Sequence, residues 1–124
     1  MLSKNTLVKM RKAIERMYDH TCDVIIKEEY EKPNHSTGMR DKTILSNQPC
    51  RISFSTVRET EKDSKASKVV QSIKLFIAPE IKIPPGSKIL VLHDGIESLF
   101  SNSGEPATYP THQEISLELF KGWA

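Results

Sequence analysis

The stretch from Val69 to Gly95 is the part of the sequence that most restricts the fold. It reads VVQSIKLFIAPEIKIPPGSKILVLHDG. The aliphatic residues Ile73, Leu75 and Ile77 alternate with Ser72, Lys74 and Phe76, which predicts a strand with one buried face. Lys88–Leu92 is apolar on both faces, so we expect it to be the most deeply buried strand of the domain.

Two turn sequences interrupt this stretch. The tetrapeptide PPGS at 84–87 has proline where a type II turn needs a fixed φ and glycine where it needs a positive φ. Asp94-Gly95 is typical of a tight hairpin, here leading into a strand over 96–100. The stretch therefore predicts an antiparallel meander around which the rest of the chain closes.

The remaining segments predict one helix and further strands. Apolar residues recur at helical spacing over 3–18, at Leu7, Met10, Ile14 and Met17. Alternating patterns predict strands over 21–27, 50–55 and 112–120. The polar segment 28–48 is expected to form a loose hairpin or excursion with a short strand at 43–45.

These elements predict a mainly β fold. We expect a small antiparallel β-barrel with an N-terminal α-helix and a long mobile inter-strand loop, because closure of a sheet removes exposed edges. A chain of 124 residues suits one domain, with the helix in 1–20 and the barrel in 21–124.

The long loop is predicted over Thr56–Lys68. This segment mixes charges of both signs with small polar residues, so it buries too little apolar surface to offset its ordering entropy. Its charged residues of interest are Arg58, Glu59, Glu61, Lys62, Asp63, Lys65 and Lys68.

Charge is unevenly distributed along the chain. The net charge is only +2, but residues 1–20 hold five basic against two acidic residues, and residues 94–124 hold one basic against five acidic. On the predicted helix, Lys9, Lys12 and Arg16 lie opposite the apolar stripe. This basic face either contacts an acidic neighbour or is simply solvated.

The sequence contains no catalytic or metal-binding motif, so we expect neither enzymatic activity nor a cofactor. Cys22 and Cys50 are expected to be reduced core thiols. A barrel that binds nucleic acid remains an alternative, although only Phe76 beside Lys74 offers the aromatic and basic pairing that such barrels use. No apolar run is as long as a membrane span and no signal peptide is recognised, so an intracellular protein is expected.

The order of these elements and several local sequences resemble a family of phage proteins. The sequences are PCRISF before the charged segment, VVQSIKLFIAP after it, IPPGSKI, and the closing YPTHQEISLELF. Together they are similar to the head–tail connector (head-closure or stopper) family of phages and of PBSX-type defective prophages of Gram-positive bacteria, over nearly the whole chain.

The resemblance implies a structural role in the virion neck. Such proteins form a ring below the portal and adaptor, close the DNA-filled head and present a surface to the tail. Partners would be portal, adaptor and tail-completion proteins, first in the host cytoplasm and then in the neck of the particle. On this analogy the Thr56–Lys68 loop faces the channel through which DNA passes, without reading its sequence, and stopper and tail-completion roles are not separated.

A ring requires two different surface patches that meet head to tail. The basic helix face with Lys9, Lys12 and Arg16 and the acidic end of the chain are complementary in this sense. The alternative remains a small OB-like or SH3-like barrel that binds nucleic acid or another protein inside the cell.

Overall fold

One helix and seven strands make up the computed structural model, which describes residues 3–60 and 67–123. The helix is α1 (Lys4–Glu15), and the strands are β1 (His20–Glu31), β2 (Thr37–Thr60), β3 (Ser67–Ile77), β4 (Lys88–His93), β5 (Ile96–Asn102), β6 (Ala107–Thr108) and β7 (Gln113–Leu119). The predicted fold class, mainly β with an N-terminal helix, is confirmed. Both predicted turns are present, with Gly86 at φ 77° and with Asp94 and Gly95 at φ 52° and 77°.

Six of the strands form a closed antiparallel sheet. Their order is β3-β2-β1-β4-β5-β7, and pairing of β3 with β7 returns the ladder to its first strand. The inward side chains form the core, with Leu75, Ile77, Ile89 and Val91 fully buried. Alternate residues point inward on every strand, which is why the period-2 patterns of β3 and β7 identified them correctly.

The meander predicted over 69–95 is wrong in one respect. β4 pairs with β5, but β3 pairs with β2 and β7 and lies across the closed sheet from β4. The connection between β3 and β4 therefore passes over one end of the sheet, where Ile81 and Ile83 pack against the core. Gln113 holds this connection because its side-chain amide donates to the carbonyl oxygens of Ala78 and Ile81.

Of the two forms predicted for the polar segment 28–48, the hairpin is confirmed and the excursion is wrong, because β1 and β2 pair within it. The short strand expected at 43–45 is part of β2, which is one strand of 24 residues. Its register against β1 shifts on both sides of Val24, which marks β-bulges. Asn47 has a positive φ of 52° at one of them, and its backbone N–H donates to Asp23 Oδ1 at 2.8 Å. The turn-like Asn47 thus bends a strand instead of ending it.

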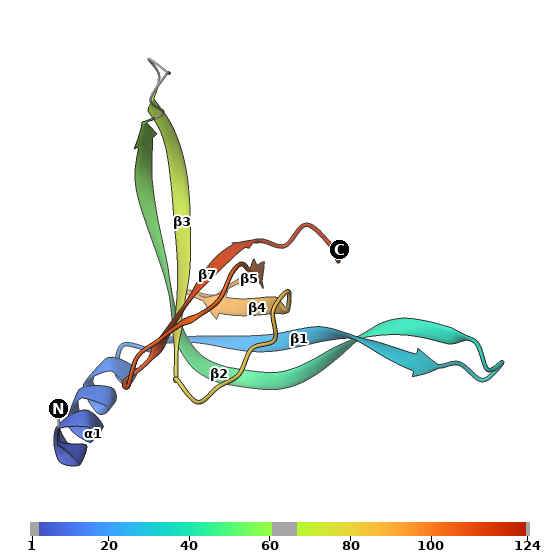
Figure 1. Cartoon of the computed structure of the whole chain (residues 1–124), viewed down its shortest axis with the longest axis horizontal. Coiled ribbons are helices and arrows are strands. Elements are labelled where there is room, and N and C mark those ends of the chain that lie inside the picture. The colour runs from blue at the N-terminus through green and yellow to red at the C-terminus, as the bar shows by residue number, and fades with distance from the viewer. Residues whose placement is uncertain (1–2, 61–66, 124) are drawn as a thin grey trace.

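Two hairpin arms project from the closed sheet in different directions (Figure 1). In the β1–β2 arm, residues 26–31 and 37–42 pair only with each other, and in the β2–β3 arm the same holds for 55–60 and 67–72. The predicted loop over Thr56–Lys68 is therefore wrong at its edges, because paired strand reaches Thr60 and resumes at Ser67. Isolated two-stranded ladders are marginally stable in water.

One face of the β1–β2 arm has internal support. The Arg40 guanidinium lies 5.0 Å from the centre of the Tyr30 ring, and Arg40 and Lys42 both approach the Glu28 carboxylate, at 3.6 and 3.9 Å. Tyr30 lies directly opposite Gly38 in the ladder. A Cβ atom at position 38 would come within 3.0 Å of the Tyr30 ring, so glycine lets the ring lie flat across the strand.

We therefore expect Gly38→Val to loosen this arm. The valine side chain displaces the Tyr30 ring and should destabilise the arm by about 1 kcal/mol. Hydrogen exchange should show lost protection for the amides of 26–31 and 37–42 and unchanged protection in the closed sheet. Thr37→Val is the matched control, because it adds a β-branched apolar residue one position away, on the other face of the arm. Equal loss of protection in both variants would contradict the role of Gly38.

The C-terminal segment is tied to the base of the β1–β2 arm. Trp123 Nε1 donates to Asp41 Oδ1 at 3.0 Å, and Lys88 Nζ donates to Asp41 Oδ2 at 2.7 Å. The Lys88 ammonium also lies over the rings of Phe120 and Trp123, at 5.2 and 5.5 Å. Trp123 thus packs on its own chain.

Candidate functional site

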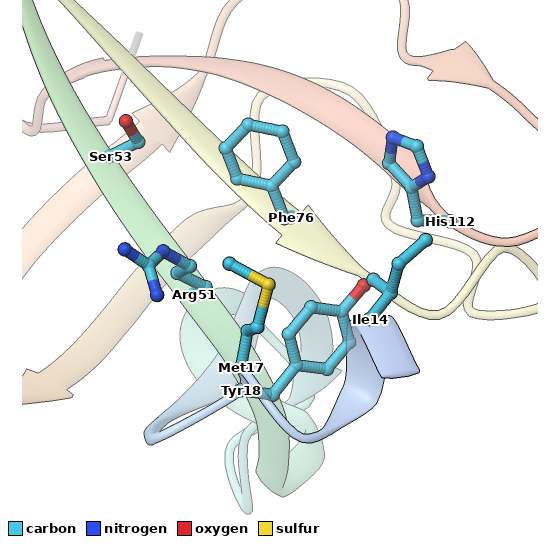
Figure 2. Close-up of a pocket in the computed structure, with 7 residues that line it drawn as sticks. All are labelled: Ile14, Met17, Tyr18, Arg51, Ser53, Phe76 and His112. Atoms are coloured by element: carbon cyan, nitrogen blue, oxygen red, sulfur yellow. The ribbon is translucent and has the colours of Figure 1, made fainter. Parts of the chain in front are cut away.

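A groove of about 310 Å³ lies between the end of α1 and the outer face of the β2–β3 pair (Figure 2). Ile14, Met17, Tyr18 and Phe76 give it an apolar lining, and Arg51, Ser53 and His112 complete it. Tyr18 has a raised pKa, first because of burial and then because of nearby Glu15, so its hydroxyl is neutral at physiological pH. In the part of the chain that the structure describes, this covered hydroxyl has no hydrogen-bond partner.

Helix α1 is only lightly packed on the sheet. None of its residues is buried, although its apolar stripe has the spacing of a core-facing helix. Met10 and Met17 are 42% and 52% exposed, and Val8, on another side of the helix, is 47% exposed. Ser3 caps the helix by accepting a hydrogen bond from Thr6 N–H, which explains why so exposed a helix begins there.

Arg11 fastens α1 to the sheet. Its Nε donates to Glu15 Oε1 at 2.8 Å within the helix, and its Nη2 donates to Glu80 in the β3–β4 connection. The hydrogen bond from Arg11 lowers the pKa of Glu80, and the same contact raises the pKa of Arg11. Both side chains are partly exposed, so the contact positions the helix and adds little stability to the whole domain.

We expect Arg11→Ala to free α1 without unfolding the sheet. Hydrogen exchange should show faster exchange over 4–15, and melting of the closed sheet should be unchanged. Because the pKa of Glu80 is lowered in the folded protein, the stabilisation from this pair is present above the ordinary glutamate pKa. It is lost as the pH falls through the lowered value. Lys12→Ala is the control, since Lys12 forms no ion pair with Glu80. Equal exchange rates over 4–15 in the two variants would show that the Arg11–Glu80 contact does not hold α1 in place.

The predicted contact residues Lys9, Lys12 and Arg16 are all exposed. They lie on the side of α1 opposite Leu7 and Ile14, which are its more covered residues. No ion pair involves them within the described ranges. The structure therefore places these three cations together on an outward basic face, opposite the Ile14 side of α1 that lines the groove.

The outer face of the β4–β5 pair carries an apolar patch that the sequence prediction missed. Leu90 lies opposite Leu99 in the ladder, and Leu92 is two residues along from Leu90 on the same face. Leu92 and Leu99 are 44% and 42% exposed. We call Leu90, Leu92 and Leu99 the leucine patch. The prediction that Lys88–Leu92 is buried on both faces is wrong, because only Ile89 and Val91 point into the core.

Acidic side chains border the leucine patch. Glu97 is directly opposite Leu92, and Asp23 of β1 is opposite Leu90. Glu118 of β7 is opposite Ser101, farther along the outer face of β5. Glu97 and Glu118 are exposed, so this side of the closed sheet combines apolar and negative surface.

Of the predicted channel-facing residues, Arg58, Glu59 and Lys68 lie in paired strand. Arg58 and Glu59 belong to β2, opposite Val69 and Lys68 of β3. The remaining candidates lie outside the described residues: Glu61, Lys62, Asp63 and Lys65.

Two other sequence features have structural explanations. Cys22 and Cys50 are free and buried in the core, as predicted, and the pKa of Cys50 is raised by its contact with Cys22 and by burial. His20 and His93, far apart in the sequence, meet with ring centroids 5.8 Å apart. His20 Nδ1 accepts a hydrogen bond from Ile52 N–H and His93 Nε2 bonds to Ser98 Oγ at 3.1 Å, so both rings support the end of the sheet.

In residues 3–60 and 67–123, no three histidine, cysteine, aspartate or glutamate side chains gather closely enough to hold a metal ion. Within the same ranges, α1 is too short and too polar to cross a membrane, and no other helix qualifies.

Comparisons with known proteins identify a structural neighbour. No protein-family model matches the sequence. No curated protein matches it either. The structure is similar to that of protein xkdH from the phage-like element PBSX of Bacillus subtilis, with a TM-score of 0.50 and 12% identity over 81% of this chain and 92% of that one. At such low identity the likeness establishes a shared fold.

Proposed function

We propose that this chain is a structural subunit of a phage or phage-like particle, and that it acts in the neck as part of a ring that closes the DNA-filled head and joins it to the tail. The observation that carries the proposal is the fold shared with a protein of the phage-like element PBSX, which extends over most of both chains. In this role the closed sheet is a small β-barrel that serves as a rigid body.

The distribution of unburied elements supports a role in assembly. In a small domain that functions alone, the apolar face of a helix is usually buried and a hairpin usually packs on further strands. Here α1 has no buried residue, and the outer part of each arm is a two-stranded ladder. Contacts with neighbouring subunits would supply the missing packing. Portal, adaptor and tail-completion proteins are the neighbours that this role implies. The β2–β3 arm, one of two that project from the closed sheet, is the element that this role assigns to the central channel (Figure 1).

Localisation in particles tests the proposal. A strain that produces the particles should be compared with one that lacks this gene, and the particles should be examined by electron microscopy. We expect free tails and heads that lose their DNA in the deletion strain, and immunogold labelling at the head–tail junction in the wild type. Normal joined particles without the protein would overturn the proposal.

One observation favours a second function, binding of single-stranded nucleic acid. Tyr109 stacks on His112 at 4.9 Å, and Phe76 lies 6.0 Å from the same imidazole. Arg51, opposite Phe76 in the ladder, adds a positive charge beside this aromatic row. Stacking platforms next to cations are what single-strand binders present.

Fluorescence anisotropy with labelled single-stranded oligonucleotides separates the two functions. A nucleic-acid-binding protein should bind with strong salt dependence and lose about tenfold or more in affinity in Tyr109→Ala, because stacking on an exposed ring is removed. A neck subunit should show only weak binding that Tyr109→Ala leaves unchanged.

A further inference from the structure

One backbone edge of β1 is left open where the strand leaves the closed sheet. β4 pairs with β1 from Thr21 to Ile25, and β1 continues beyond this pairing through Ile26–Glu31 (Figure 1). β4 cannot extend farther along β1, because Pro84 and Pro85 precede it and proline has no N–H to donate. Within the described residues, Ile26–Glu31 pairs with β2 on one side and with no strand on the other. We call this second side the open edge; alternate residues turn their backbone N–H and C=O groups toward it.

A second groove, of about 410 Å³, lies at the root of the open edge. It is lined by Ile26 and Lys27 of β1, by the turn 84–87 and by Trp123. A strand that runs along the open edge in line with β4 would end in this groove. The open edge offers backbone hydrogen bonds and the groove offers a place for one apolar side chain, which together are the parts of a strand-addition site.

The exposed face beside the open edge is acidic. Glu29 and Glu31 are exposed and lie two residues apart, so their carboxylates share one face of the arm. Glu31 pairs with His35, and Glu29 takes part in no ion pair among the described residues. Lys27 shares this face but lies opposite Asp41 at the base of the arm. A strand beside β1 is therefore favoured when it places lysine or arginine opposite the two glutamates.

The same charges disfavour a second copy of the open edge as the occupant. Two copies related by a two-fold axis would pair antiparallel about a residue that lies opposite itself. When the pairing is centred on Lys27, Glu28 or Glu29, that residue meets its own like charge. When it is centred on Tyr30, Glu29 lies opposite Glu31. Like charges directly opposite each other destabilise a ladder, so a different segment fits this edge better.

We propose that the open edge of β1 binds an extended segment of another protein, antiparallel to β1, with lysine or arginine at alternate positions. The basic side chains lie beside Glu29 and Glu31, and the last residue of the segment enters the groove at the root of the edge. A row of backbone groups selects an extended chain, and the carboxylates select a basic one. This contact does not depend on the role in the neck, and it gives the β1–β2 arm the third strand that an isolated hairpin lacks.

Peptide binding to the intact protein tests this proposal. The probe is the peptide KVKVSI, capped at both ends, whose lysines would lie opposite Glu31 and Glu29 and whose isoleucine would lie beside Ile26. Titration followed by NMR should show binding with a Kd of about 1 mM or lower, with amide shifts confined to 26–31 and to the turn 84–87. The acidic counterpart EVEVSI should bind at least about tenfold more weakly, because two cross-strand attractions become repulsions.

Matched variants test the charge selection. Glu29→Lys with Glu31→Lys should lower the affinity for KVKVSI by about tenfold or more and raise that for EVEVSI. Both glutamates are exposed, so the fold should survive. Glu97→Lys with Glu105→Lys makes the same change in net charge away from the arm, and it should leave the affinity for both peptides unchanged.

Two methylated peptides test the backbone ladder. N-methylation of one set of alternate residues removes the N–H groups that would face β1, and methylation of the other set removes those that would face solvent. Only one of the two methylated peptides should therefore bind. Equal binding by both, the absence of KVKVSI binding at about 3 mM, or shifts centred on α1 would each overturn the proposal. A wild-type protein that dimerises through 26–31 without peptide would also overturn it, because the occupant would then be a second copy.

Discussion

Leu75→Ala is expected to lower the free energy of unfolding by about 3 kcal/mol. Leu75 is fully buried near the middle of β3, and its ladder partners Ile52 and Ile115 also point into the core. Removal of the leucine side chain therefore costs apolar burial and leaves a cavity that three paired strands cannot easily close. Chemical denaturation followed by circular dichroism measures the change, which should lower the melting temperature by about 10 °C.

Leu92→Ala is the matched control for this prediction. The same side chain is removed from the outer face of the same closed sheet, where it is 44% exposed, so less than about 1 kcal/mol should be lost. Equal destabilisation by the two substitutions would show that the leucine patch is part of the core of the folded monomer.

Local chemistry made much of the fold predictable. The Pro84–Ser87 turn, the Asp94-Gly95 hairpin and the alternation of β7 depend only on residues that are neighbours in the sequence. The pairing of β3 was not predictable in this way. Its partners β2 and β7 are chosen by closure of the whole sheet, which no single segment encodes.

Polar segments were the main source of error. The segments 28–48 and 56–60 contain few apolar residues, and this composition usually indicates loops. Here they form strands because the hairpin ladder satisfies their backbone groups, while Arg40, Tyr30 and Glu28 support one another across it. Backbone hydrogen bonds and cross-strand side-chain contacts hold the two strands of such a hairpin together, and hydrophobic periodicity reveals neither.

The candidate site was only half predictable. The basic residues of α1 were found from helical spacing, and the structure places them on one outward face. The leucine patch was missed, although its signal is present in the sequence as a strand that is apolar on both faces. Such a strand can be buried between two layers or can keep its second face for another molecule, and only the structure distinguishes these cases for Lys88–Leu92.

Reversal of the basic face, Lys9→Glu with Lys12→Glu and Arg16→Glu, is expected to block joining of heads to tails. In the proposed neck these cations contact an acidic surface on a neighbouring subunit or ring, so reversal replaces attraction by repulsion. Assembly of joined particles in a strain that carries only this variant should fall by about tenfold or more. Particle counts by electron microscopy and infectious or particle titre measure the loss.

The variant must remain folded for this result to be informative. The three side chains make no ion pair within the described residues, so the only intramolecular cost is that of placing negative charge near the C-terminal end of α1, about 1 kcal/mol or less. Thermal melting should confirm this small change. Normal joining by the reversed helix would show that this face is merely solvated.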